Sequence, residues 1–243
     1  MITGSAKGIG AATAKLLGEH GAAVVVNYRG RVKEAQEIAD SIQQKKGKAV
    51  AIQADVTQLP DIQKLVNETM NHFGKIDIWI NNVSDYTGPK MVTEVEWGDY
   101  IKEFEGAVKS TLLCCQTVIP IMQKQKYGRI INLVSTLVTR PVGGYSAHAT
   151  AKSALMGFTK TLAKEVGKHG ITVNMVSPGM TLTEEVLKTP EKARNTIAEK
   201  TPLKRLATPE DIAVAILFFA SDLSSFITGA YLPIDGGLSL PIP

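Results

Sequence analysis

Two side chains that could take part in proton transfer lie in the segment GGYSAHATAKSALMGFTKTLAKE, residues 143–165. His148 and Lys152 are four residues apart, so on a helix both side chains lie on the same face. An imidazole is a common general acid or base near neutral pH. Because a neighbouring ammonium group disfavours the imidazolium form, Lys152 is expected to leave His148 a better base than acid at pH 7.

Two alternatives to this proton chemistry stay open in the same segment. Tyr145, three residues before His148, lies on a similar helical face and is a second candidate acid. Tyr145 could instead be a packing aromatic at the entrance of the helix. His148 itself could line the site without any proton role.

The segment TGSAKGIG, residues 3–10, is a candidate phosphate-binding turn. Glycine permits a tight turn and lets backbone amides approach a pyrophosphate at a helix N-terminus. The segment opens a helical pattern and precedes a strand pattern, as a dinucleotide site requires. The alternative is a structural loop. The residues predicted to contact the dinucleotide are Gly4, Ser5, Lys7, Gly8, Ile9 and Gly10.

The end of the following strand pattern, VVVNYRGR at residues 24–31, indicates which dinucleotide would bind. NAD sites usually place a carboxylate there to bind the ribose 2′-hydroxyl, and this segment has none. Tyr28 and Arg29 stand at the strand end, and Lys7 adds a cation in the glycine turn. A 2′-phosphate is attracted to such cations, which favours NADP(H). Alternatively, Lys7 and Arg29 are solvated surface residues.

Strand and helix patterns alternate along the chain, which predicts an α/β fold with a doubly wound, Rossmann-type parallel sheet and helices on both faces. One long helix is expected over residues 96–126, bent near Pro120. No linker or repeat divides the sequence, so residues 1–243 are predicted to form a single domain. The predicted strands cover residues 22–28, 48–55, 75–82, 128–135, 170–179 and 229–237, and the other helices cover residues 9–21, 31–47 and 60–74.

A central strand normally leads into the glycine-rich turn of such a sheet. Here the turn begins at Thr3, so Met1 and Ile2 can supply only the last fragment of that strand. The first strand is therefore largely absent. We expect a sequence truncated at its front, since a sheet with a central gap would expose two unpaired edges.

The composition excludes several other classes of protein. The net charge of +4 is modest, the basic residues are scattered, and no run of about 18 apolar residues occurs. A cytoplasmic protein that binds neither nucleic acid nor membrane is expected. The adjacent Cys114 and Cys115 are expected to be buried, reduced thiols. No metal site is expected, because the histidines show no ligand spacing: His20, His72, His148 and His169.

Eight segments together resemble the classical short-chain dehydrogenase/reductases over essentially the whole chain. Within that family the sequence looks most like the 3-oxoacyl-acyl-carrier-protein reductases. The segments are TGSAKGIG, ADV, GKIDIWINN, GRIINLVS, AKSALMGFTKTLAKE, ITVNMVSPG, TPLKRLATPEDIA and ITGAYLPIDGG.

The resemblance implies roles for the matching positions. Ser135 would orient the substrate carbonyl, and Lys152 would bind the nicotinamide ribose. Asp55 and Val56 would hold the adenine, and Asn82 would border the nicotinamide ribose. The nicotinamide carboxamide would be held by Pro178, Gly179, Thr181 and Thr183.

Three departures from the family pattern cluster around the implied site. The family's active-site tyrosine falls on His148, and its helix asparagine, which takes part in a proton relay, falls on Ala107. The family's NNAG segment becomes NNVS, with Ser84 in place of the glycine. These changes indicate altered or lost chemistry.

Two functions remain open on the sequence alone. The first is an NADP(H)-dependent oxidoreductase that transfers a hydride between nicotinamide and a carbonyl or alcohol, with 3-oxoacyl thioesters as a candidate substrate class. The second is a catalytically impaired, nucleotide-binding oligomeric protein with a regulatory or structural role. The resemblance implies a homotetramer and a substrate lid at about residues 180–206. It also implies docking of an acyl carrier protein at positions that hold Lys126 and His169.

Overall fold

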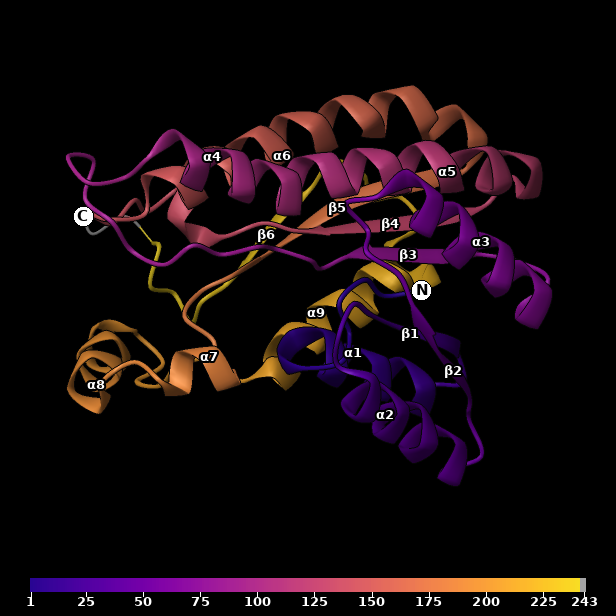
Figure 1. Ribbon diagram of the computed structural model, residues 1–243, viewed down its shortest axis with the longest axis horizontal. Helices are drawn as coiled ribbons and strands as arrows, with labels where there is room; N and C mark the ends of the chain where they lie inside the picture. Colours follow the sequence, from indigo (N-terminus) through magenta and orange to yellow (C-terminus); the bar gives the residue numbers. More distant parts are fainter. Residues whose placement is uncertain (241–243) are drawn as a thin grey trace.

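The structure of the chain, a computed structural model, describes residues 1–240 and consists of a parallel β-sheet between two layers of helices (Figure 1). Four strands pair in the order β3-β4-β5-β6, and β1 pairs with β2; all these pairs are parallel. The predicted α/β class is therefore confirmed. The strands are β1 (Ala23–Tyr28), β2 (Lys48–Gln53), β3 (Ile78–Asn81), β4 (Gly128–Leu133), β5 (Ile171–Pro178) and β6 (Tyr231–Ile234).

Met1 to Thr3 join the two groups of strands at the centre of the sheet. Ile2 is fully buried and bridges Val26 of β1 and Ile80 of β3. The Ile80 N–H donates to the Met1 carbonyl at 3.0 Å, and the Thr3 N–H donates to the Ile80 carbonyl at 3.0 Å. Met1 and Ile2 thus occupy the predicted central position, directly before the glycine-rich turn.

Helices cover both faces of the sheet, as the doubly wound pattern predicts (Figure 1). One face packs against α1 (Gly8–Glu19), α2 (Val32–Gln44) and α9 (Pro209–Ala220). The other packs against α3 (Leu59–Phe73), α5 (Ser110–Gln125) and α6 (Ser146–Val166). Since both faces are buried, the strands need near-continuous apolar runs, which is how they were recognised in the sequence.

The long helix predicted over residues 96–126 forms, and it contains a π-helical segment that was not predicted. It consists of α4 (Trp97–Phe104), a π-helical segment (Glu105–Lys109) and α5, which continues through the exposed Pro120. The bend expected near Pro120 stays a prediction. At Gly106 a Cβ atom would lie 2.5 Å from the backbone nitrogen of Asp85. The wider π-helical turn therefore lies where the helix backbone closely approaches the segment that contains Asp85.

The predicted lid segment contains two short helices, α7 (Glu184–Leu187) and α8 (Glu191–Lys200). A bridge between Thr181 and Ala207 ties the two ends of this segment together. Cys114 and Cys115 are free and buried in α5, as expected. Within residues 1–240, no helix is both long and apolar enough to cross a membrane.

Candidate active site

The glycine-rich turn is held in place by the buried Asn27 at the end of β1. Its Oδ1 accepts from the Gly4 N–H at 3.0 Å, and its backbone carbonyl accepts from the Ser5 N–H at 2.8 Å. Its Nδ2 donates to the Ala54 carbonyl at 3.0 Å, which links the turn to the segment after β2. From the sequence, position 27 mattered only because it holds no acid. The role of Asn27 in positioning the turn was not predicted.

Close packing explains why this turn requires glycine at two positions. Gly8 has a φ of 53°, and a Cβ there would lie 3.2 Å from the Thr183 methyl group. A Cβ at Gly10 would lie 2.8 Å from the Asn82 side-chain nitrogen. Thr183 and Asn82, both implied cofactor residues, therefore lie directly against the turn.

The N-terminus of α1 fits the pyrophosphate of a dinucleotide. Lys7 is the N-cap residue, and its side chain does not cap the helix. The first-turn N–H groups of an α-helix have no intrahelical acceptor, and the helix dipole favours an anion there. A side-chain-free cradle at a helix N-terminus is the arrangement that dinucleotide binding needs, so the residues present fit such a cofactor.

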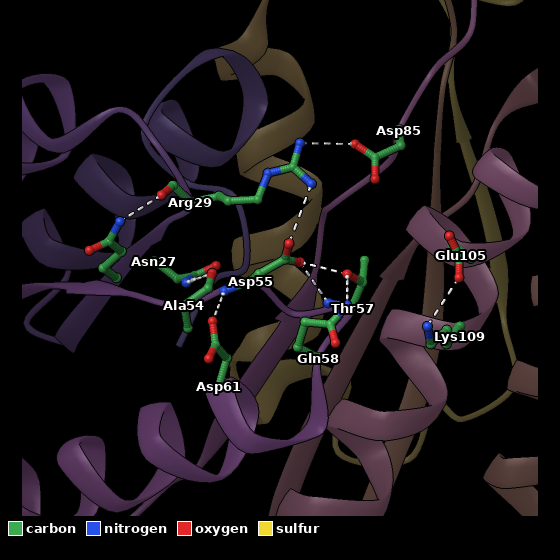
Figure 2. A network of polar contacts seen from close by, with 11 residues as sticks. Asn27, Arg29, Ala54, Asp55, Thr57, Gln58, Asp61, Asp85, Glu105 and Lys109 are labelled. Atoms are coloured by element: carbon green, nitrogen blue, oxygen red, sulfur yellow. Dashed lines mark hydrogen bonds and ion pairs between the residues drawn. The ribbon is translucent and has the colours of Figure 1, made fainter.

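Arg29 lies between two carboxylates (Figure 2). Its guanidinium nitrogens lie 3.6 Å from an oxygen of Asp55 and 3.5 Å from an oxygen of Asp85. Burial raises the pKa of Asp55, but hydrogen bonds from Thr57 and the charge of Arg29 outweigh this and lower it overall. The charge of Arg29 is thus balanced by carboxylates, whereas Lys7 is exposed beside the turn and has no ion pair within residues 1–240.

The other implied cofactor residues gather at the carboxyl edge of the sheet. Asn82 follows β3, and its Nδ2 donates to the Thr3 carbonyl at 2.9 Å. Pro178 ends β5 and leads into Gly179. The buried Thr181 donates through Oγ1 to the Gly179 carbonyl at 3.1 Å. This edge is where ligands bind in doubly wound sheets.

Lys152 connects α6 to the end of β4. Its side chain is 3% exposed, and Nζ donates to the Leu133 carbonyl at 2.9 Å. Burial lowers the pKa of Lys152 to about 8, and the charge of Glu103 opposes this effect. Ser135 lies two residues beyond Leu133, where its Oγ accepts from the Leu137 N–H at 3.3 Å and keeps its own proton to donate. The structure thus brings Ser135 and Lys152 to the same strand end.

His148 lies one turn before Lys152 on α6 and contacts a residue that the sequence reasoning missed. Its Nδ1 lies 3.0 Å from Oε2 of Glu103, whose side chain is fully buried at the end of α4. The sequence-based expectation for His148 considered Lys152, and the structure adds a carboxylate, Glu103, in direct contact with the ring. A signal was available, since Glu103 precedes Ala107 by one helical turn and so faces the same side.

Tyr145 pairs with another aromatic residue. It is the N-cap of α6, and its ring stacks on that of Tyr86 with the centroids 6.2 Å apart. Tyr86 also meets the His148 ring edge-on at a centroid distance of 5.5 Å. Burial, followed by the Tyr145 hydroxyl and the charge of Glu103, raises the pKa of Tyr86 above its usual range. This arrangement matches the packing role that was weighed for Tyr145.

These features define a dinucleotide-binding oxidoreductase: a glycine cradle at a helix N-terminus lies on the same sheet edge as a serine, a histidine and a buried lysine. The family profile described as Enoyl-(Acyl carrier protein) reductase matches residues 4–239.

Proteins similar in sequence and in structure lead to the same class. The chain is 33% identical over 240 residues to the 3-oxoacyl-[acyl-carrier-protein] reductase FabG of Staphylococcus epidermidis, covering 98% of this chain and 97% of that protein. It is 36% identical over 244 residues to the FabG of Thermotoga maritima, covering 98% and 96%. The crystal structure of levodione reductase superposes with a TM-score of 0.93 at 27% identity, covering 99% of this chain and 97% of that one.

The chain belongs to the short-chain dehydrogenase/reductase family and is an oxidoreductase of that family. This family uses a nicotinamide cofactor, in agreement with the glycine cradle. The alternative of a nucleotide-binding protein without turnover receives no support from these relatives, all three of which are named reductases.

Proposed function

We propose that the protein is an NADP(H)-dependent oxidoreductase that interconverts a carbonyl and an alcohol. The observation that carries the proposal is the convergence of His148, Ser135 and the buried Lys152 at the sheet edge that also holds the glycine cradle. A nicotinamide bound there would supply or accept the hydride. The side chains then have to bind the substrate oxygen and move one proton.

Each of the three side chains has a task that suits its environment. Ser135 keeps a hydroxyl proton that can be donated to the substrate oxygen. Lys152, with its pKa lowered to about 8, is a cation at pH 7 and would bind ribose hydroxyls. His148 has a second ring nitrogen, Nε2, with no hydrogen-bond partner among residues 1–240, and this nitrogen would give or take the proton.

The preference for NADP(H) rests on Lys7. This exposed lysine stands at the N-terminus of α1, and no carboxylate occupies residues 27–31 at the end of β1. Arg29 would contribute only by sharing its charge between the two carboxylates beside it and a 2′-phosphate. Lys7 is therefore the residue on which the choice of cofactor depends.

A 3-oxoacyl thioester is the substrate class to test first, because the similar FabG proteins are named 3-oxoacyl-[acyl-carrier-protein] reductases. An acyl carrier protein is the corresponding partner. Lys126 and His169 precede β4 and β5, at the edge of the sheet opposite Ser135. A carrier protein docked there would deliver its substrate to the site of a neighbouring subunit in the proposed homotetramer. Exposed apolar residues near α9 are candidates for the interfaces of that homotetramer: Val214, Phe218, Leu223 and Phe226.

NADPH oxidation should be measured with acetoacetyl thioesters and a panel of small ketones, from about pH 5 to about pH 8. We expect turnover of at least one carbonyl. If NADPH binds and no carbonyl is turned over at any pH, the proposed activity is wrong. A rate higher with the acyl carrier thioester than with a small thioester, and reduced by Lys126→Glu, would support the protein partner.

A further inference from the structure

Glu103 is a buried carboxylate that none of the roles above includes. Its side chain is 0% exposed, although it lies on a helix with neighbouring charged residues that face solvent. Buried carboxylates need hydrogen-bond donors, and Glu103 has donors on both oxygens. Oε1 accepts from the Thr87 N–H at 3.0 Å and lies 3.5 Å from the Thr87 hydroxyl, while Oε2 faces Nδ1 of His148.

We propose that Glu103 is a positioning residue that makes His148 a workable proton carrier in place of the tyrosine expected at that position. It would do so by holding the ring in one orientation with Nδ1 protonated. This inference rests on the proposed function, because it assigns a role within the same site. Glu103 acts through His148 and does not touch the substrate.

The hydrogen bonds determine which ring nitrogen carries the proton. An ionised carboxylate can only accept, so Nδ1 of His148 must donate to Oε2. In the neutral ring Nε2 then carries a lone pair, and in the imidazolium it carries a proton. The edge of Tyr86, at 84° to the imidazole plane, further restricts rotation of the ring. His148 is therefore oriented with Nε2 as the nitrogen that exchanges protons with a substrate.

The charges around His148 come from several elements. Lys152 lies one turn further along α6, and Glu103 lies at the end of α4. The ring of Tyr86 meets the imidazole edge-on and stacks on the ring of Tyr145. Glu103 bonds the imidazole directly, whereas the Nζ atom of Lys152 donates to the Leu133 carbonyl.

The position of Glu103 connects two departures from the family pattern. The relay asparagine that the resemblance implies is replaced by Ala107, and the tyrosine by His148. Glu103 lies one helical turn before Ala107, just ahead of the π-helical segment, and reaches the ring that replaces the phenol. The histidine and the carboxylate thus form a new pair where the phenol and asparagine are both missing.

The proton balance is the same in both directions. In reduction, Nε2–H passes its proton to the substrate oxygen while the carbonyl carbon receives the hydride, and His148 becomes neutral with Nδ1–H still bonded to Glu103. In oxidation, Nε2 takes the hydroxyl proton while the hydride leaves the carbinol carbon. Glu103 stays ionised throughout, as the carboxylate of a Ser-His-Asp triad does.

Glu103→Gln tests the proposal because it should move the proton of the neutral His148 ring from Nδ1 to Nε2. The Thr87 N–H needs an acceptor, so the amide oxygen should face Thr87 and the amide NH₂ should face Nδ1. Nδ1 must then accept, which leaves the neutral ring with its proton on Nε2. Glu105→Gln is the matched control, since Glu105 is exposed and pairs with Lys109.

The tautomer can be read without any turnover, from the ¹⁵N chemical shifts of labelled histidine rings. The chain has four histidines, and His148→Gln assigns the relevant signal. We expect Nδ1–H in neutral wild-type protein and in Glu105→Gln, and Nε2–H in Glu103→Gln.

Kinetics give the second readout. Glu103→Gln should lower kcat at least about 100-fold with little change in NADPH affinity, since a wrong tautomer removes proton transfer but not cofactor binding. An Nε2–H tautomer in the wild-type protein overturns the proposal, even if the variant fails to fold. A variant that shifts the tautomer but turns over like Glu105→Gln also overturns it. If Glu103→Gln shifts the tautomer as expected but the wild-type protein reduces no carbonyl, only the proposed function is contradicted.

Discussion

Replacing Lys152 by Met is expected to stabilise the fold while it removes activity. Burial lowers the pKa of Lys152 from 10.5 to about 8, although the charge of Glu103 opposes this. At pH 7, burying the charged Lys152 therefore lowers the free energy of unfolding by about 3 kcal/mol. Losing the hydrogen bond from Nζ to the Leu133 carbonyl costs about 1 kcal/mol. The net gain is about 2 kcal/mol, equivalent to a Tm increase of about 5 °C.

The pH dependence of this gain has a definite sign. Both states of the wild-type protein hold the Lys152 proton at pH 7, and the folded state loses it first, near pH 8. Between about pH 8 and about pH 10.5 the unfolded state binds more protons, so the wild-type free energy of unfolding rises with pH. The advantage of Lys152→Met should therefore shrink over this window and end as a disadvantage of about 1 kcal/mol.

Urea denaturation of both proteins at about pH 7 and about pH 10 measures this difference, because other titrating groups cancel between them. Lys160→Met is the control, since Lys160 is an exposed lysine on the same helix and should change stability little at either pH. An equal stability difference between wild type and Lys152→Met at both pH values would show that burial does not lower the pKa of Lys152. NADPH-linked turnover of Lys152→Met should be lost at both.

Three further predictions concern the cofactor and the proton carrier. Lys7→Ala should raise the Kd of NADPH about tenfold and leave that of NADH unchanged, as measured by fluorescence titration; equal effects on both would refute the 2′-phosphate assignment. Gly10→Ala should abolish binding of either dinucleotide, since its Cβ would lie 2.8 Å from a side-chain nitrogen, and unchanged affinity would contradict that packing. His148→Tyr should have a lower kcat than wild type, because the carboxylate of Glu103 disfavours a phenolate. Adding Glu103→Gln to that variant should raise kcat at least about tenfold. No rise would show that Glu103 does not act specifically through His148.

Much of the fold could be predicted because it depends on local patterns. A strand buried on both faces needs a continuous apolar run, and each covering helix needs apolar residues at helical spacing. The π-helical segment at Glu105–Lys109 could not be predicted in this way. It lies where Gly106 closely approaches Asp85, and a local pattern does not show such a contact between distant segments.

The candidate site was predictable where each residue adjoins a strand end or a helix start. Glycine spacing identified the cradle, and the four-residue spacing of His148 and Lys152 placed both on one helix. Glu103 escaped because a glutamate on a partly exposed helix ordinarily faces solvent. Its burial results from the Thr87 N–H and the His148 ring, which come from two distant segments. The balanced charge of Arg29 escaped for the same reason.

His148 is the residue that we propose carries the proton in this oxidoreductase. The most direct measurement compares kcat for acetoacetyl thioester reduction by wild type and His148→Gln, with NADPH affinity measured on both proteins. We expect NADPH affinity to be retained in His148→Gln while kcat falls at least about 100-fold. A His148→Gln variant that binds NADPH and reduces the thioester at the wild-type rate would contradict it.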